Sequence, residues 1–168
     1  MEPTLLLILF CSLILFNFVF SAILDYINDK NWKNKIPNEL KDFYDKEKYL
    51  KAKNYKKSRG KVSLISSILS TSLTLLILTT GIYGYVSDYI YKIYSSSFLH
   101  SATFFLFFYL INMVINIPIS YYSTFVVEEK FGFNKTSLKT FLMDIIKGSF
   151  MSIIIGGLLL GAALFLYD

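Results

Sequence analysis

Four long stretches without a charged residue constrain the fold of this chain more than any other feature. The chain has 168 residues, of which 54% are hydrophobic and 17% charged, yet residues 5–24, 62–85, 99–119 and 150–167 contain no Asp, Glu, Lys or Arg. Each stretch is close to the ~20 residues that cross a hydrocarbon core about 30 Å thick. Backbone polar groups find no water there, so each stretch must satisfy them internally as a helix. The sequence therefore predicts an all-α polytopic membrane protein, with four transmembrane helices in one domain over residues 1–168.

The first stretch has a second interpretation, as a cleaved signal peptide. A signal peptide begins with a basic region, whereas Met1–Thr4 contains Glu2 and neither Lys nor Arg. The residues Val19–Ser21 offer only a weak cleavage site of the small-residue type. We therefore interpret the stretch as a membrane span.

Basic residues concentrate in two of the three connections between the spans. Twelve of the 17 Lys and Arg residues lie from Lys30 to Lys61, four more lie in residues 130–147, and Lys92 alone occupies the second connection. Basic connections stay on the cytoplasmic side of a membrane, which predicts that both ends of this chain face away from the cytoplasm. Acidic residues also occur within residues 25–47, which argues against nucleic-acid binding by the first connection.

The connections carry their own helix signals. Residues 25–38 are expected to be irregular, because they are rich in Asn and contain Pro37. Asp45 is a candidate N-cap for a long helix that starts on the cytoplasmic side at Lys46 and passes or kinks at Gly60 before it crosses the membrane. In the last connection, the apolar spacing predicts a short amphipathic helix at the cytoplasmic surface. It would contain Leu138, Phe141, Leu142, Ile145 and Ile146, with Asn134 as its N-cap and Gly148 at its end.

Polar residues inside the spans mark candidate packing faces. Five hydroxyl residues share one face of the second span, where they favour either close helix packing or the wall of a water-filled cavity. Asn112 and Asn116 are four residues apart, which predicts hydrogen bonds between helices, and Pro118 is expected in the last turn of that span. The hydroxyl residues are Ser63, Ser66, Ser67, Ser70 and Thr74.

The fourth span contains a pair of glycines with the spacing of close helix contacts, Gly157 and Gly161. Small residues let two helix backbones approach each other in lipid. We expect this face to meet a helix outside the chain. Packing against the second or third span is the alternative.

The most distinctive polar segment is Thr124-Phe-Val-Val-Glu-Glu-Lys-Phe-Gly-Phe-Asn-Lys-Thr136. Its glycine, Gly132, permits a positive φ between two aromatic residues, so that both rings can face one surface. Taken alone, its charges indicate a solvated cap on the third span.

This segment resembles the Val/Ile-Glu-Glu-Lys-x-Gly-Phe-Asn signature of the CAAX prenyl protease type I family of integral-membrane zinc metallopeptidases. Two weaker elements follow the family pattern in the same order. The segment Ile36-Pro-Asn-Glu-Leu40 is similar to Val/Ile-Pro-x-Glu-Leu, and Tyr49-Leu-Lys-Ala-Lys-Asn-Tyr55 is similar to Tyr/Phe-x-Lys-Ser/Ala-x-x-Tyr. With Pro118 and Tyr122, the similarity extends over nearly the whole chain.

The resemblance implies a zinc endopeptidase that trims prenylated or other membrane-associated proteins and encloses a large chamber within the membrane. Such enzymes cut with an H-E-x-x-H site, whereas this chain has one histidine, His100, so we expect no catalytic residue, metal or cofactor here. The zinc would belong to a metalloprotease domain in the same gene or in a separate chain. The family pattern makes Glu128, Glu129, Lys130, Phe131, Gly132, Phe133 and Asn134 a candidate docking segment for that domain.

The expected partners are thus the lipid bilayer, the metalloprotease domain and prenylated or membrane-associated substrates. The location would be the inner membrane of a bacterium or the endoplasmic reticulum of a eukaryote. A non-enzymatic membrane scaffold of the same ancestry is the alternative function. A small transporter or channel is disfavoured because no span contains a charged residue.

The partition of basic residues can be tested by cysteine labelling on a Cys11→Ser background. In intact cells, cysteines placed at Lys53 and Asn134 should be protected from an impermeant reagent, whereas one at Tyr91 should react. Reaction of the Lys53 and Tyr91 replacements from the same side of the membrane would contradict the four-span topology.

Overall fold

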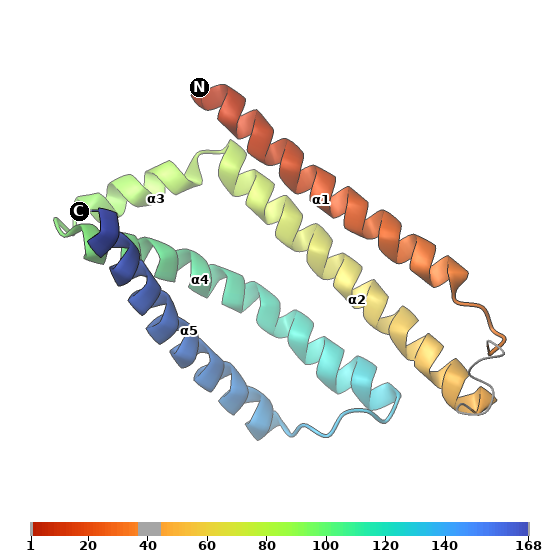
Figure 1. Cartoon of the computed structure of the whole chain (residues 1–168). Helices are drawn as coiled ribbons and strands as arrows, with labels where there is room; N and C mark the ends of the chain where they lie inside the picture. The colour runs from red at the N-terminus through yellow and green to blue at the C-terminus, as the bar shows by residue number, and fades with distance from the viewer. Residues whose placement is uncertain (1, 37–44, 168) are drawn as a thin grey trace. The chain divides into compact units, whose positions relative to one another are not determined.

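The computed structural model describes residues 2–36 and 45–167, and every regular element within those ranges is a helix (Figure 1). Four of the described helical stretches are long and apolar enough to cross a membrane, by length and composition. This confirms the all-α fold class of a polytopic membrane protein, while the limits of the spans in the membrane stay predictions. The elements are α1 (Pro3–Asn31), α2 (Lys46–Thr79), α3 (Ile82–Tyr91), α4 (Ser97–Tyr122), the π-helix η2 (Ser123–Glu128) and α5 (Leu138–Tyr167).

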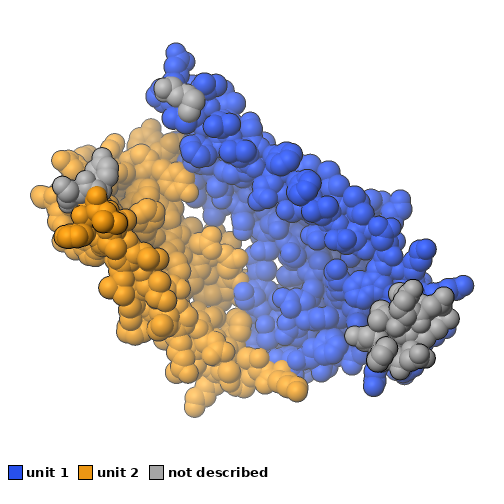
Figure 2. All heavy atoms as spheres, in the orientation of Figure 1, with its two compact units in different colours: residues 1–80, 119–134 blue, residues 81–118, 135–168 orange. Residues whose placement is uncertain are grey.

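The chain divides into two compact units (Figure 2). Unit 1 comprises residues 1–80 and 119–134, and unit 2 comprises residues 81–118 and 135–168. Each unit combines segments that are distant in sequence, and one of the three boundaries falls inside α4, after Pro118.

In unit 1, α1 and α2 lie side by side and run in opposite directions, and η2 packs against α2 (Figure 1). Tyr49 of α2 and Val127 of η2 are among the few buried apolar side chains of the described residues. Much of the remaining apolar surface is exposed, as in Phe16 and Ile65. That arrangement suits helices whose outer faces contact lipid rather than water.

In unit 2, α3 packs against the first turns of α4, and α5 lies beside α4. The Tyr83 ring lies 4.6 Å from the Phe108 ring, centroid to centroid. His100 Nε2 lies 3.2 Å from Ser87 Oγ. Farther along α4, the Ser149 hydroxyl of α5 donates a hydrogen bond of 3.1 Å to the sulfur of Met113.

Helix α1 continues past the first uncharged stretch as far as Asn31, so the prediction of irregular structure from Asp25 was wrong over those residues. The extra turns lie along α2, where the Asp29 carboxylate is 3.9 Å from the point at which a Cβ on Gly60 would stand. Packing against a neighbouring helix outweighs the weak helix propensity of Asn and Asp. The predicted Ile36–Leu40 element lies outside the described residues after Ile36.

Helix α2 starts at Lys46 as predicted and passes through Gly60 without a break. Asp45 occupies the N-cap position, although its side chain makes no capping hydrogen bond. The helix ends at Thr79, and Gly81 then adopts a left-handed conformation, with φ 73°, that leads into α3. The second uncharged stretch is therefore shared between two helices, because glycine enters this conformation without the steric cost of a Cβ.

The chain does not leave its helix at Pro118, which we had expected in the last turn of the third span. Pro118 lies inside α4, and the helical path continues through η2 to Glu128. A proline removes one backbone donor from the helical ladder, and wide π turns are common near functional sites. The signature segment consequently begins on a helix rather than after one.

The predicted amphipathic helix and the fourth span form one helix, α5, which passes through Gly148. Gly148 therefore does not end a helix, since its cost of about 1 kcal/mol relative to Ala is small beside the packing of a 30-residue helix. The N-cap is Ser137 and not Asn134. The Ser137 hydroxyl accepts a hydrogen bond of 3.2 Å from the Thr140 amide.

Candidate functional site

The signature segment forms a glycine-terminated helix end. Gly132 has φ 67°, as its place between two aromatic residues predicted. Its amide donates to the Glu129 carbonyl at 2.9 Å, and the Phe133 amide donates to the Glu128 carbonyl at 2.9 Å. These two bonds define a Schellman motif, in which a left-handed glycine lets the chain reverse and caps the last carbonyls of the helix. The motif explains why this string requires glycine at position 132.

Both aromatic rings of the segment face Tyr55 on α2, which confirms that they share one surface. The ring centroid of Tyr55 lies 5.6 Å from that of Phe131 and 4.7 Å from that of Phe133, both edge to face. The Lys51 ammonium lies 5.1 Å from the centroid of the Phe133 ring. Aromatic pairs of this geometry contribute about 0.5–1.5 kcal/mol beyond the area that they bury. The segment is thus held against α2 on one side.

Glu128 adds polar contacts to the same place. The Tyr55 hydroxyl and the Arg59 guanidinium each donate to Glu128 Oε1 at 3.4 Å, and Arg59 also donates to the Tyr55 oxygen at 3.2 Å. The hydrogen bond to Tyr55 raises the pKa of Arg59, which lies outside the uncharged stretch of its helix, and nearby Glu128 acts in the same direction. The Arg59 side chain is 54% exposed, so the ion pair stabilises the fold only weakly.

The outer side of the segment remains open to solvent or a partner. Glu129, Lys130 and Gly132 are exposed, and Phe133 is 45% exposed despite its contact with Tyr55. The Asn134 amide donates to Glu129 Oε2 at 2.9 Å, which ties the end of the turn back to its helix. The residues Glu128–Asn134 therefore form a fixed turn with one face covered and one face available.

The partner residues on α2 were missed in the sequence, although Lys51, Tyr55 and Arg59 recur every four residues and so share one helix face. Tyr49 belongs to the same element of the family pattern as Tyr55, but it contacts the end of α1 instead of the signature segment. It is 8% exposed, and its hydroxyl donates to the Lys33 carbonyl at 3.2 Å. The element Tyr49–Tyr55 thus joins α2 both to the end of α1 and to the signature segment.

The hydroxyl face of α2 lines a cleft against α1. Ser66, Ser67 and Ser70 contribute to a space of about 320 Å³ within unit 1, together with Asn17 and Ser21. The Thr74 hydroxyl instead donates to the Ser70 carbonyl of its own helix at 2.8 Å. The hydroxyl face of α2 therefore both packs toward α1 and borders a cleft with polar residues. These are the two alternatives that the sequence left open.

Asn112 and Asn116 bond to each other along α4, and their bonds to another helix stay a prediction. The Asn116 amide donates to the Asn112 side-chain oxygen at 2.7 Å and to the Asn112 backbone carbonyl at 2.8 Å. Residues four apart on a helix are neighbours, so the Asn116 amide group and the Asn112 side-chain oxygen can reach each other.

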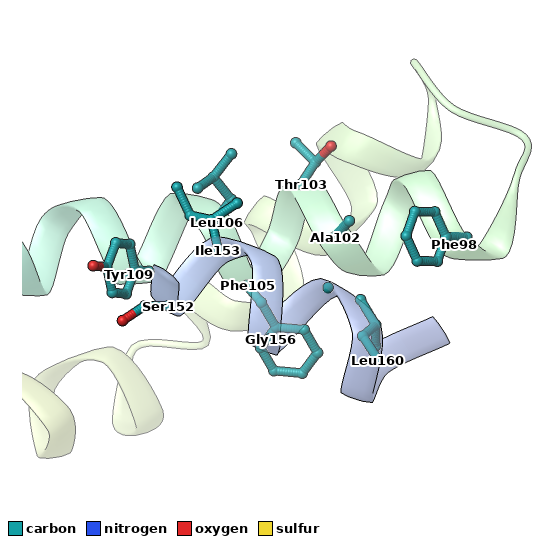
Figure 3. Close-up of a pocket in the computed structure, with 11 residues that line it drawn as sticks. Phe98, Ala102, Thr103, Phe105, Leu106, Tyr109, Ser152, Ile153, Gly156 and Leu160 are labelled. Atoms are coloured by element: carbon teal, nitrogen blue, oxygen red, sulfur yellow. The ribbon is translucent and has the colours of Figure 1, made fainter. Parts of the chain in front are cut away.

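The glycine face of α5 borders an apolar groove in unit 2 (Figure 3). The groove has a volume of about 570 Å³ and is lined from α4 by residues such as Phe105 and Leu106. A Cβ at Gly161 would lie 3.6 Å from the Phe98 ring, whereas one at Gly157 would meet nothing within 4 Å. Gly161 thus faces the third span, while Gly157 lies beside open space.

The residues described here do not fit a zinc site. No group of three or more His, Cys, Asp and Glu side chains that could hold a metal occurs within the described ranges. The ring of His100 is engaged with Ser87, whose backbone carbonyl lies 3.1 Å from Nε2.

Comparison with known proteins decides the family. The family model described as CAAX prenyl protease N-terminal, five membrane helices, matches residues 25–168. The chain belongs to this family. The resemblance read from the signature segment is therefore confirmed, and the chain corresponds to the N-terminal membrane region of these proteins.

Curated relatives and a solved structure agree with this assignment. The chain is 33% identical over 142 residues to the probable CAAX prenyl protease 1 of Schizosaccharomyces pombe, covering 74% of this chain and 30% of the relative. It is 28% identical over 164 residues to the CAAX prenyl protease 1 homolog of Dictyostelium discoideum, covering 94% and 38%. The crystal structure of S. mikatae Ste24p matches with a TM-score of 0.81 and 28% identity over 99% of this chain and 39% of that chain. The chain thus spans about a third of the length of these relatives.

The glycine turn can be tested by substitution in the detergent-solubilised protein. Gly132→Ala should lower the free energy of unfolding by ~1–2 kcal/mol, because alanine resists the left-handed conformation. Gly148→Ala is the matched control, since Gly148 is helical with nothing within 4 Å of its Cβ position. The control should be neutral or stabilising by up to ~1 kcal/mol in the same denaturant titration. Equal stabilities for Gly132→Ala and the unsubstituted protein would contradict the role of the turn.

Proposed function

We propose that this chain forms the membrane part of a zinc metalloendopeptidase that processes prenylated or other membrane-associated proteins. The family match over residues 25–168 supports the proposal. Because the described residues do not fit a zinc site, the metal would be held by a metalloprotease domain outside this chain. The chain's own contribution would be part of the wall around the substrate and a surface that holds the catalytic domain. The relatives named above come from eukaryotes, which favours the endoplasmic reticulum as the membrane.

The docking surface that we propose is the open face of Glu128–Asn134. The observation that carries it is the fixed turn, which is held on α2 by Tyr55 and yet leaves Phe133 45% exposed. A solvated cap requires neither a fixed reversal nor an exposed aromatic ring. An aromatic ring on a rigid, charged turn is typical of an anchor in a protein interface.

The complete enzyme provides the test of docking. Gly132→Val and Asn134→Ala should each lower kcat/KM for a farnesylated CAAX peptide by about tenfold, which corresponds to ~1.4 kcal/mol of lost stabilisation. Valine resists the positive φ of the turn, and alanine removes the amide that binds Glu129. Membrane insertion and yield should not change. Gly148→Ala serves as the control in the same enzyme.

Wild-type turnover in both variants would contradict docking and would indicate that the segment is only a solvated cap on its helix. A transcript whose reading frame stops after Asp168, without an H-E-x-x-H sequence, would favour the alternative function as a non-enzymatic membrane scaffold. A frame that continues into that sequence would favour the protease.

We also propose that the open space beside Gly157 is covered by a helix of the complete enzyme, because the relatives are about three times as long as this chain. Gly161→Leu should destabilise the isolated chain by about 1–3 kcal/mol, because a Cβ there would already be in van der Waals contact with the Phe98 ring at 3.6 Å, and the larger side chain needs space that the ring occupies. Gly157→Leu should leave that stability unchanged or raise it by up to ~1 kcal/mol, yet it should destabilise the complete protein. Cross-linking from Gly157→Cys identifies the neighbour. Cross-links confined to α4 would contradict the proposal and assign this face to packing within the chain.

A further inference from the structure

A second cleft between α1 and α2 combines basic and aromatic side chains. It lies within unit 1, has a volume of about 340 Å³, and is distinct from the hydroxyl-lined cleft. Three lysines and one aspartate are among its lining residues, so the cleft carries a net positive charge. Its lining residues are Tyr26, Asp29, Lys30, Trp32, Lys53 and Lys57.

The cleft begins at about the outer edge of the lipid headgroup layer, and Lys53 lies farther out, about 13.5 Å of helix before Val62. Lys30 follows the end of the first uncharged stretch, Leu24, by about 9 Å of helix, and Lys57 precedes the start of the second, Val62, by about 7.5 Å, at 1.5 Å per residue. The headgroup layer adds about 5–8 Å to each side of a hydrocarbon core about 30 Å thick. The two helices run in opposite directions, so these lysines reach the same depth from the two walls.

The walls of the cleft are held in place by contacts within the chain. The Trp32 ring lies 6.1 Å from the Tyr49 ring, and the Lys56 ammonium lies 5.3 Å from the centroid of the Trp32 ring. Lys53 donates to the side-chain oxygen of Asn34 at 2.6 Å, which brings the chain after α1 to the edge of the cleft. Tryptophan commonly lies at the membrane interface, where its ring spans the apolar and the polar layer.

The lysines of the cleft have no carboxylate partner at ion-pairing distance among residues 2–36 and 45–167, where the one ion pair joins Arg59 to Glu128. Their charge is therefore available to an anion. Basic pockets between membrane helices on the cytoplasmic side suit phosphate-bearing lipid headgroups, and the cytoplasmic leaflet is rich in anionic lipid. The positive-inside distribution places this cleft on that side.

We propose that this cleft binds the phosphate of an anionic phospholipid headgroup. Lys30, Lys53 and Lys57 donate charge-assisted hydrogen bonds to the phosphate oxygens. Asp29, which also lines the cleft, accepts a hydrogen bond from a headgroup hydroxyl, which favours phosphatidylinositol over a headgroup without hydroxyls. The acyl chains extend along the exposed apolar face of α1, where Phe16 and Phe20 lie.

Trp32 gives the test a probe without a label, because it is the only tryptophan in the sequence. Phosphatidylinositol is titrated into the protein in phosphatidylcholine nanodiscs while tryptophan fluorescence is recorded, and native mass spectrometry counts the lipids retained. We expect saturable binding of phosphatidylinositol. The triple variant Lys30→Gln, Lys53→Gln, Lys57→Gln should bind at least about tenfold more weakly, because each lysine near an anionic lipid contributes to the attraction.

The matched control removes the same charge elsewhere, by Lys135→Gln, Lys139→Gln and Lys147→Gln, and should bind as the unsubstituted protein does. Equal losses in both triple variants would overturn the proposal in favour of diffuse charge attraction. Equal retention of phosphatidylcholine and phosphatidylinositol would also overturn it. Inorganic phosphate at millimolar concentration should leave the titration unchanged, and saturation by phosphate alone would show that the cleft binds the free ion instead of lipid.

Folding of the variants is checked by helical circular dichroism and elution volume. If the triple variant loses helix content, Lys57→Gln is compared with Lys61→Gln, which is close on the same helix but outside the cleft. Weaker binding in Lys57→Gln alone supports the site, and equal binding in the two contradicts it. None of these readouts depends on proteolysis, so the outcome is independent of the proposed enzymatic function.

Discussion

The contact of Tyr55 with the glycine turn is the interaction on which the organisation of unit 1 depends. It joins residues that are separated by 73 positions, as the hydrogen bond from Tyr55 to Glu128 shows. The exposed Arg59–Glu128 pair contributes at most about 1 kcal/mol, whereas two edge-to-face ring contacts together contribute about 1–3 kcal/mol beyond the area that they bury. The ring contacts therefore contribute more than the ion pair to keeping the turn against α2. Without the left-handed glycine, Phe131 and Phe133 would not both reach the same ring.

The helices of this chain were predictable because the membrane imposes its requirement on each short stretch of sequence. A run of about 20 uncharged residues must satisfy its own backbone, whatever its neighbours are. The positive φ of Gly132 was predictable for a similarly local reason. The helix ends were not. Asp25–Asn31 is helical because it lies along α2, and Gly148 lies within a helix because the residues on both sides of it favour one.

The sequence predicted one side of the candidate site but not the other. The string Glu128–Asn134 indicated a turn with two rings on one surface, but not the surface that receives them. Lysines occur on every side of the first part of α2. The sequence therefore does not indicate that the face with Lys51, Tyr55 and Arg59, rather than another face, receives the turn. Asn112 and Asn116 show the same limit. Two amides four residues apart can bond across helices or along one, and only the structure shows the bonds along α4.

The first part of α2 carries two sets of contacts on different faces. At about 100° per residue, Lys51, Tyr55 and Arg59 lie within about 80° of one another, whereas Lys53 and Lys57 lie about 160° from Tyr55, and Tyr49 about 120° from it. One face holds the signature turn, and the other holds Trp32 and borders the lysine cleft. A continuous helix cannot rotate one face without moving the other. Occupation of the cleft by a lipid would therefore restrain the same helix that positions the turn, and would reduce the conformational entropy that a partner must remove on docking.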